Sequence, residues 1–288
     1  MNTSASRSTI CSNASAKHAI HSVTERRKLP ETAAQKTALI TGASSGIGRA
    51  FALGYAARGV NIVAVARRRA PLDALASELS ARHGVTVTVL PADLSKADDP
   101  EYLFETLPRQ GIAIDILVNN AGFGVPGHLC ENDWERHRAT IEVMATAPVR
   151  LAYLFAPTMI ERGHGRIINV SSLSALLPPH AGGTLYYPVK SFLYQFSLAF
   201  REEMRGRGVN VTAVCPGFTA TNFRAAAGGT VESVAVPRWL WSSPEDVADA
   251  AIRAAEANKA VVIPGLFNKA VAATFKLLPG PVARRIMQ

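Results

Sequence analysis

Short apolar runs alternate along this chain with segments whose apolar residues recur every three to four positions. Such alternation predicts βαβ units, and therefore a parallel sheet. The runs are near-continuously apolar, as expected for strands covered by helices on both faces. The runs lie at residues 37–41, 61–65, 85–90, 114–118, 165–170, 209–214 and 260–263. The segments expected to be helices are 47–58, 72–82, 98–107, 133–162, 188–205 and 244–257.

The sequence therefore predicts an α/β fold, with one doubly wound, Rossmann-type domain built on a seven-stranded parallel sheet with helices on both faces. We expect this domain to cover residues 36–265. Residues 1–35 are rich in Ser, Ala and Thr without apolar periodicity, which is typical of a disordered extension. A transit peptide would fit their acid-poor composition, but a secretory signal would need an apolar segment that is missing. Residues 266–288 are expected to form a basic helical tail.

Charge and cysteine content exclude several classes of protein. The net charge of +9 is concentrated at the two ends, and no basic stripe is interleaved with aromatic residues, so nucleic acid is not an expected partner. Three widely spaced cysteines argue against a disulfide framework or a zinc site and favour a reducing compartment, here the cytoplasm. No apolar run approaches the length of about 18 residues that a membrane span needs.

A glycine-rich turn joins the first predicted strand to the first predicted helix. Gly42, Gly46 and Gly48 stand in the stretch TGASSGIG, at residues 41–48. Glycine permits positive φ and close backbone approach, and a helix N-terminus offers free N–H groups, so this turn suits a pyrophosphate. Its spacing, G-x-x-x-G-x-G, differs from the dinucleotide fingerprint G-x-G-x-x-G.

The end of the second strand indicates which dinucleotide is bound. An NAD site would place an acid about 20 residues after the glycine turn, to accept from the ribose 2′-hydroxyl. Residues 49–72 contain no Asp or Glu, and Arg67, Arg68 and Arg69 stand where that acid would be. Guanidinium groups suit a 2′-phosphate. The sequence therefore predicts NADP(H) rather than NAD(H), against the alternative of a solvated helix start.

With these motifs the chain resembles the short-chain dehydrogenase/reductase family over about residues 36–265. The family's motifs occur in order, as TGASSGIG (41–48), ADL (92–94), NNAG (119–122), NVSS (169–172), YYPVK (186–190) and PGFTAT (216–221). Each follows a predicted strand, and strand carboxyl ends line the cofactor crevice of a doubly wound sheet. The cofactor-binding residues that the motifs and the resemblance imply are Gly42, Ser44, Ser45, Gly46, Ile47, Gly48, Arg67, Arg68, Asp93, Leu94, Asn120, Tyr186, Lys190, Thr219 and Thr221.

The resemblance also implies the catalytic residues Ser172, Tyr186 and Lys190. Tyr186, rather than Tyr187, stands four residues before Lys190, and on a helix the two side chains share a face. A nearby cation stabilises phenolate and lowers the pKa of a tyrosine, which is otherwise near 10. Ser172 would hydrogen-bond the substrate oxygen. Ser171 is the alternative, and a cap of a helix or turn is the structural role open to both serines.

One position departs from the family pattern. Many members have an asparagine, thought to hold a water for proton supply to the lysine, where this chain has Met144. Methionine neither donates nor accepts a hydrogen bond usefully. The principal hypothesis is an NADP(H)-dependent oxidoreductase, and the alternative is a non-catalytic NADP(H) sensor of the same fold.

The substrate region is predicted to be apolar. Residues 173–183 are apolar apart from His180, and residues 222–243 contain Phe223, Trp239 and Trp241 with Glu232 as their one acid. These segments favour an apolar ketone, aldehyde or secondary alcohol. An amphipathic helix is expected near residues 267–278, with packing on the body favoured over a second subunit or a membrane surface. We also expect a homo-oligomer, and no metal.

Overall fold

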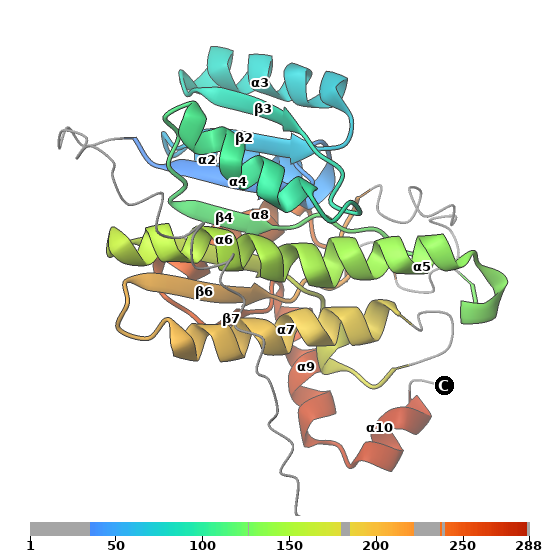
Figure 1. The fold of residues 1–288 in the computed structure, drawn as a ribbon. Helices are drawn as coiled ribbons and strands as arrows, with labels where there is room; N and C mark the ends of the chain where they lie inside the picture. The colour runs from blue at the N-terminus through green and yellow to red at the C-terminus, as the bar shows by residue number, and fades with distance from the viewer. Residues whose placement is uncertain (1–34, 126, 180–184, 222–236, 238–239, 287–288) are drawn as a thin grey trace, which may run out of the picture. The chain divides into compact units, whose positions relative to one another are not determined.

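The computed structural model describes residues 35–125, 127–179, 185–221, 237 and 240–286. The predicted disordered extension therefore lies outside the described residues, apart from Gln35. Within the described part, parallel strands form one sheet in the order β3-β2-β1-β4-β5-β6-β7 (Figure 1). The strands are β1 (Thr37–Thr41), β2 (Asn61–Ala66), β3 (Val87–Pro91), β4 (Ile116–Asn119), β5 (Gly165–Val170), β6 (Val209–Val214) and β7 (Val261–Val262).

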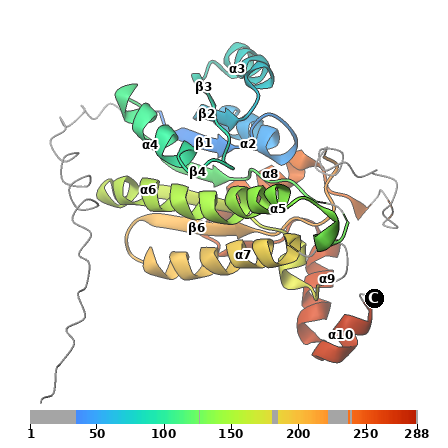
Figure 2. The same cartoon turned by 45° about the vertical axis from the view of Figure 1, so that its right-hand side comes forward.

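Helices cover both faces of this sheet, which confirms the predicted doubly wound fold (Figures 1 and 2). One face carries α2 (Gly46–Ala56), α3 (Arg69–His83) and α8 (Pro244–Glu256). The other carries α4 (Asp99–Arg109), α5 (Trp134–Ile141), α6 (Ala147–Glu161) and α7 (Tyr186–Glu203). The strand order reverses between β1 and β4, and ligands of such sheets bind at that point, beyond the strand carboxyl ends.

The strands form where successive residues are apolar, so that side chains on both faces of the sheet can be buried. Every residue of β1 is buried, and β5 and β6 have one partly exposed residue each. Two hydrophobic clusters result, one on each face of the sheet. The first includes Phe51, Tyr55 and Leu72, and the second includes Leu103 and Leu151.

A π-helical turn interrupts the long helix predicted at 133–162. It is labelled η2 (Glu142–Thr146) and joins α5 to α6. The helix from Trp134 to Glu161 is long and apolar enough to cross a membrane by length and composition alone, which the sequence reading did not anticipate. Half of its most apolar window is buried, and its inward side chains belong to the second cluster. In this structure it is a core helix.

The remaining elements lie close to the strand carboxyl ends or at the end of the chain. Two short 3₁₀ turns, η1 (Leu129–Glu131) and η3 (Leu173–Leu176), follow β4 and β5. Beyond β7, α9 (Leu266–Leu277) and α10 (Gly280–Ile286) complete the described chain. The first of these lies within one residue of the segment expected near 267–278, and α10 lies in the remainder of the tail 266–288 that was expected to be helical.

Candidate functional site

The turn from β1 to α2 has the backbone geometry that its glycines allow. Gly42 and Gly46 have positive φ, 70° and 54°. A Cβ on Gly48 would lie 2.2 Å from the carbonyl oxygen of Gly42, and one on Gly42 would lie 2.8 Å from Asn120 Nδ2. Ser44 and Ser45 lie in the same turn, Ile47 is the second residue of α2, and the Ser45 side chain does not cap this helix. The free N–H groups at the start of α2 therefore lie next to glycines at which a side chain would not fit, so no side chain at these glycines covers them.

Hydrogen bonds attach this turn to the end of β4. The Thr41 hydroxyl accepts from the backbone N–H groups of Asn120 (2.9 Å) and Ala121 (3.0 Å) and donates to the Val118 carbonyl (3.2 Å). Asn120 Nδ2 donates to the Thr41 carbonyl at 2.9 Å. Two of the predicted motifs thus meet at the point where the strand order reverses.

The arginines after β2 differ in their partners. Arg69 forms an ion pair with Asp73 at 3.5 Å. Arg67 and Arg68 are exposed, and among the described residues neither has an ion-pair or hydrogen-bond partner. Two guanidinium groups are thus available at the strand end predicted to recognise a 2′-phosphate.

Asp93 lies beyond β3, at the neighbouring strand end. Its Oδ1 accepts from the Ser95 hydroxyl at 2.8 Å and from the Ser95 backbone N–H at 3.2 Å. Leu94 beside it is buried. The backbone N–H of Ala92 donates to the Ala66 carbonyl at 3.1 Å, which holds this segment against the end of β2.

A buried amide pair joins the ends of β4 and β5. Asn119 Nδ2 donates to Asn169 Oδ1 at 2.9 Å, and Asn169 Nδ2 donates to the Ser197 hydroxyl of α7 at 2.9 Å. This chain of bonds fixes α7 against the sheet.

The two serines that follow β5 have different environments. The Ser171 hydroxyl is buried and donates to the Lys190 carbonyl at 2.7 Å. The Ser172 side chain begins η3, where its Oγ accepts from the Ser174 N–H at 3.1 Å. The Ser171 hydroxyl is thus used to hold α7. Ser172 caps η3, which is the structural role that the sequence left open for both serines. Its hydroxyl proton is still available for a further acceptor.

Lys190 and Tyr186 lie together at the start of α7. Lys190 Nζ is 5.9 Å from the centroid of the Tyr186 ring and donates to the Val170 carbonyl at 2.8 Å. Only 4% of Lys190 is exposed, and this burial lowers its pKa to about 8. The tyrosine ring packs edge-on against Tyr187, with centroids 6.4 Å apart. A cation held beside a phenol is an arrangement that can lower the pKa of the phenol.

Met144 fills the space next to this lysine. It lies in the π turn and is completely buried. A Cβ on Gly122 would lie 2.9 Å from Met144 Sδ and 3.8 Å from Lys190 Nζ. The thioether therefore packs against the NNAG segment, close to the lysine ammonium.

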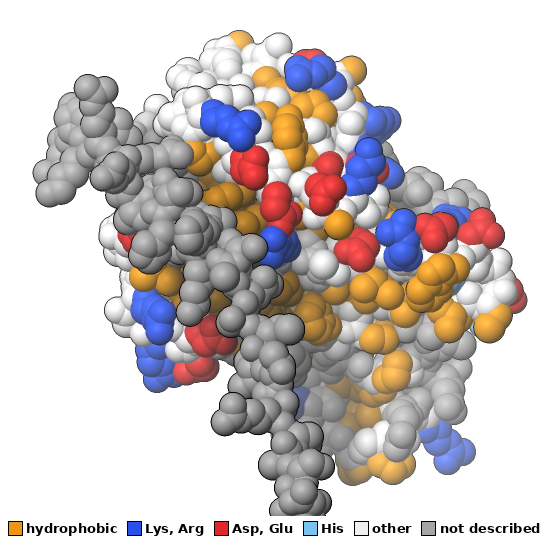
Figure 3. Space-filling view, viewed as in Figure 1, with side chains coloured by type: hydrophobic (Ala, Val, Ile, Leu, Met, Phe, Trp, Pro, Cys, Tyr) orange, Lys and Arg blue, Asp and Glu red, His pale blue; other side chains and the backbone are white. Residues whose placement is uncertain are grey.

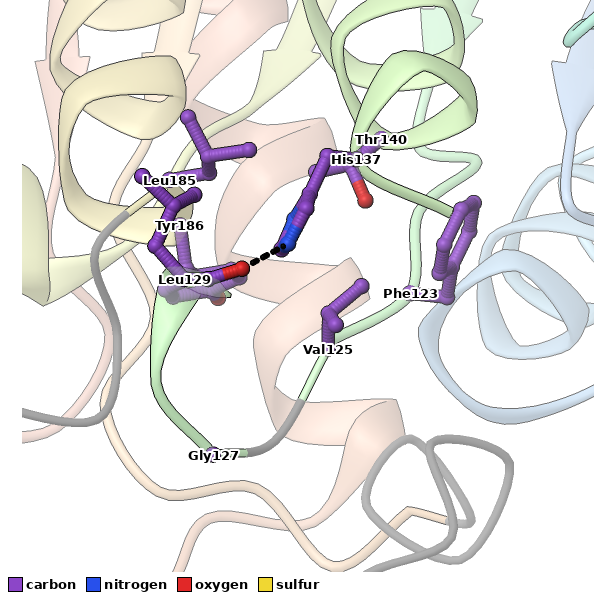
Figure 4. Close-up of a pocket in the computed structure, with 8 residues that line it drawn as sticks. All are labelled: Phe123, Val125, Gly127, Leu129, His137, Thr140, Leu185 and Tyr186. Atoms are coloured by element: carbon purple, nitrogen blue, oxygen red, sulfur yellow. Dashed lines mark hydrogen bonds between the residues drawn. The ribbon is translucent and has the colours of Figure 1, made fainter. Parts of the chain in front are cut away.

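A small pocket opens beside Tyr186 (Figure 4). Its volume is about 10 Å³, room for roughly one water molecule. The one hydrogen bond drawn in Figure 4 joins His137 Nε2 to the Leu129 carbonyl at 2.8 Å. The described residues lining it are Phe123, Val125, Gly127, Leu129, His137, Thr140, Leu185 and Tyr186, and none of these is acidic, Lys or Arg.

The segment after β6 returns to the glycine turn. A Cβ on Gly46 would lie 3.1 Å from Thr221 Cγ2, so Thr221 sits directly over the turn. The Thr219 hydroxyl donates to the Gly217 carbonyl at 3.1 Å, and Phe218 stacks on Trp241 with centroids 5.8 Å apart. The predicted substrate-loop residues His180, Phe223, Glu232 and Trp239 lie outside the described residues.

The sequence reading missed three groups near the site. His137 is 5% exposed, lines the pocket, and has a buried Nδ1 without a hydrogen-bond partner among the described residues. Gly122 allows Met144 to approach. Cys215 is buried, which raises the pKa of its thiol to about 12. Burial of single polar residues leaves no sequence pattern, and the NNAG motif alone could have indicated Gly122.

Comparison with known proteins gives a family match that covers most of the chain. The model of the family described as short chain dehydrogenase matches residues 36–231. Serine 3-dehydrogenase of Agrobacterium fabrum (strain C58 / ATCC 33970) is 36% identical, over 68% of this chain and 78% of its own. The NADP-dependent 3-hydroxy acid dehydrogenase YdfG of Salmonella typhi is 33% identical, over 74% of this chain and 86% of its own.

A solved structure gives the same result in three dimensions. A short-chain dehydrogenase from Sphingobium yanoikuyae, determined in complex with NADPH, superposes with a TM-score of 0.74 at 32% identity. The superposition covers 85% of this chain and 96% of the other.

Proposed function

Because this chain belongs to the short-chain dehydrogenase/reductase family, we propose that Tyr186 is its acid–base group, assisted by Lys190 and Ser172, and that its substrate is apolar. The chain is an NADP(H)-dependent oxidoreductase that acts on CH–OH or C=O groups of small molecules. The observation that carries the proposal is the buried Lys190 ammonium beside the Tyr186 ring.

The residues present fit the dinucleotide. The glycine turn, with no room for a Cβ on Gly42 or Gly48, leaves the α2 N-terminus open to a pyrophosphate. Arg67 and Arg68, exposed and without partners in the described part of the chain, suit the 2′-phosphate. Asp93 and Asn120 would hold the adenosine portion, and Thr219 and Thr221 the nicotinamide portion. The nicotinamide, when bound, supplies or accepts the hydride.

Tyr186 has the position and the neighbour that proton transfer requires. In the reductive direction its hydroxyl gives a proton to the carbonyl oxygen, which becomes the alcohol as the carbon gains hydride. The phenolate left behind is stabilised by the Lys190 cation. Ser172 donates its hydroxyl hydrogen to the same oxygen and stabilises the charge that develops there.

The apolar substrate is inferred from the residues beside Tyr186. Phe123, Val125, Leu129 and Leu185 surround the pocket, and its described lining contains no Lys or Arg to form an ion pair with a carboxylate. The two relatives named above act, by their names, on serine and on 3-hydroxy acids, which are both carboxylates. We therefore expect this chain to differ from them in substrate.

A substrate panel tests the proposal. NADPH oxidation is followed with apolar ketones and aldehydes, and NADP⁺ reduction with secondary alcohols, with serine and with 3-hydroxy acids. We expect kcat/KM for the best apolar compound to exceed that for any carboxylate by at least about tenfold, the cost of an unpaired charge in an apolar site. A preference for the carboxylates would contradict the apolar substrate. Turnover of an apolar compound that survives in Tyr186→Phe would contradict the role of Tyr186.

A further inference from the structure

Helix α9 has one face packed on the body. Asn268, Val271, Ala272 and Phe275 recur at helical spacing and are buried or half-buried. Asn268 Nδ2 donates to the Pro264 carbonyl at 2.8 Å, and a Cβ on Gly217 would lie 2.2 Å from Asn268 Oδ1. The helix is therefore seated against the segment that follows β6, as the favoured prediction for this tail required.

A second apolar stripe runs along the opposite side of α9. Leu266 and Leu277 are 83% and 84% exposed, with Ala270 and Ala273 exposed between them at positions i+4 and i+7. These four residues share one side of the helix, because their spacing of 4, 7 and 11 follows the helical repeat.

Lysines flank this stripe. Lys269 and Lys276 are both exposed, stand seven residues apart, and lie on the same edge of the stripe. We call these six residues the α9 face: Leu266, Lys269, Ala270, Ala273, Lys276 and Leu277. After Glu256 the chain has five basic residues and no acidic residue, so the face carries positive charge alone.

Helix α10 continues the apolar character of the α9 face. Val282 and Ile286, one turn apart, are 46% and 60% exposed. Arg285 beside them is exposed. Figure 3 shows hydrophobic and basic side chains together at the lower right, in the region where Figure 1 places α10.

An open groove borders the lysine edge of the α9 face. Its volume is about 590 Å³, and its lining includes Ile252 and Val262 together with Lys259 and Lys269. Two arginines on its rim, Arg58 and Arg253, are engaged with Asp249. Lys259 and Lys269 have no carboxylate partner in the part of the chain that the structure describes. The groove also has one carboxylate in its lining, Glu256, which is paired with Arg166 at 3.4 Å. It therefore combines an apolar lining with two cations that have no such partner.

Exposure alone would not single out this region, since Trp134 on α5 is also 65% exposed. That residue stands between Asp133 and Glu135, which would repel an anionic surface. None of the six residues of the α9 face is acidic, and no Asp or Glu stands beside them in the sequence. Contact with a second copy through the same face would bring its lysines together, which costs free energy. Both the charge and the apolar stripe match one partner, an anionic lipid surface.

We propose that the α9 face, with α10 and the adjoining groove, docks this protein on anionic membranes. The apolar stripe enters the boundary between head groups and acyl chains, while Lys269 and Lys276 pair with lipid phosphates. The groove receives a further head group at Lys259. This mode of binding lies in the plane of the interface and requires no membrane span.

Flotation with vesicles tests the docking surface on the full chain. Vesicles of equal parts phosphatidylglycerol and phosphatidylcholine are compared with vesicles of phosphatidylcholine alone, and the fraction of protein bound is measured. We expect binding to the anionic vesicles to be at least about tenfold stronger, and to weaken with salt. The double variant Lys269→Gln/Lys276→Gln and the single variant Leu277→Ser should each reduce binding by roughly tenfold. Matched controls are Lys96→Gln, an exposed lysine outside the α9 face, and Trp134→Ser, an exposed apolar residue outside it.

Three results would overturn the proposal. The first is equal binding to both kinds of vesicle. The second is binding that the α9 variants leave unchanged, as would follow if the basic residues of 1–36 were responsible. The third is a dimer, seen by light scattering, that dissociates in Leu277→Ser while no vesicle binding is found. Thermal unfolding of each variant, expected to match the wild type, excludes loss of folding as the cause.

Discussion

The cofactor side of the site and the substrate side are built in different ways. Around the glycine turn the path of the backbone sets the fit, as at Gly48, where a Cβ would lie 2.2 Å from the Gly42 carbonyl oxygen. Around the pocket, side chains converge from separate segments, as Phe123, His137 and Tyr186 do (Figure 4). A tight backbone turn can be formed only by particular residue types, here glycine. A pocket wall can be formed by any residue of suitable shape and polarity. The first kind of site leaves a readable pattern in a sequence, and the second leaves little.

Removing the phenol of Tyr186 should separate the two sides most clearly. We expect Tyr186→Phe to lower kcat by about 10²–10⁴-fold, because the transferable proton is lost. NADPH affinity, measured by fluorescence titration, should stay within about twofold of wild type because the glycine turn and Arg67 are untouched. Tyr187→Phe is the matched control and should keep most activity. If Tyr187 proves to be the essential residue, the assignment from spacing is wrong.

Burial of Lys190 should appear as a pH dependence of stability. Lysine in an unfolded chain titrates near 10.5, but here the pKa is about 8, so the unfolded state binds more protons between these values. The free energy of unfolding should therefore rise with pH across that range. Below pH 8 the buried cation costs about 3 kcal/mol, of which about 2 kcal/mol should be recovered between pH 7 and 9.5.

Urea unfolding at several pH values measures this effect. Lys190→Met removes the titrating group, so its stability should lack the rise, whatever constant amount the lost bond to Val170 contributes. Parallel stability curves for the two proteins would contradict the lowered pKa of Lys190.

The fold could be predicted from the sequence because each strand is a local signal. The runs 37–41, 165–170 and 209–214 coincide with β1, β5 and β6. The boundaries of other elements moved by up to three residues, since helix ends depend on caps and tertiary contacts. The helix predicted at 188–205 begins at Tyr186, and Pro188 still lies in its first turn, where no intrahelical N–H bond is lost.

The site was predictable where chemistry recurs at fixed spacing. The sequence placed Tyr186 and Lys190 one turn apart, and the structure brings them together. It did not reveal that His137 reaches the same pocket from α5, because nothing in a single histidine marks it as buried. It also gave no sign of the π turn that contains Met144, whose side chain packs against Gly122.

Cofactor preference should depend on the arginines at the end of β2. We expect Arg67→Ala to weaken NADPH binding by about 1.5–3 kcal/mol, roughly 10- to 150-fold, and to leave NADH binding nearly unchanged. Titration of both cofactors measures the difference. Arg69→Ala is the matched control, since Arg69 is paired with Asp73. Equal affinity of the wild type for the two cofactors would remove the role proposed for Arg67.

The smallest expected effect concerns Met144, which lies next to Lys190 on the substrate side of the site. The thioether packs beside Lys190 Nζ and offers no useful hydrogen bond, so a proton must reach the lysine by another route. Turnover should therefore be slow but measurable, which distinguishes an enzyme from the non-catalytic sensor. Met144→Asn should raise kcat by up to about tenfold, the low end of a positioned proton-transfer group, with NADPH affinity within about twofold.

The comparison variant for this position is Met144→Leu, which preserves an apolar side chain of similar volume and should leave kcat unchanged. An asparagine at this completely buried position also leaves polar atoms to satisfy, so Met144→Asn should lose about 1–3 kcal/mol of stability unless a water enters with it. A water that does enter would form the relay and would spare that cost. Higher kcat with little loss of stability would therefore support the relay, and equal kcat in the Asn and Leu variants would show that Met144 only fills space.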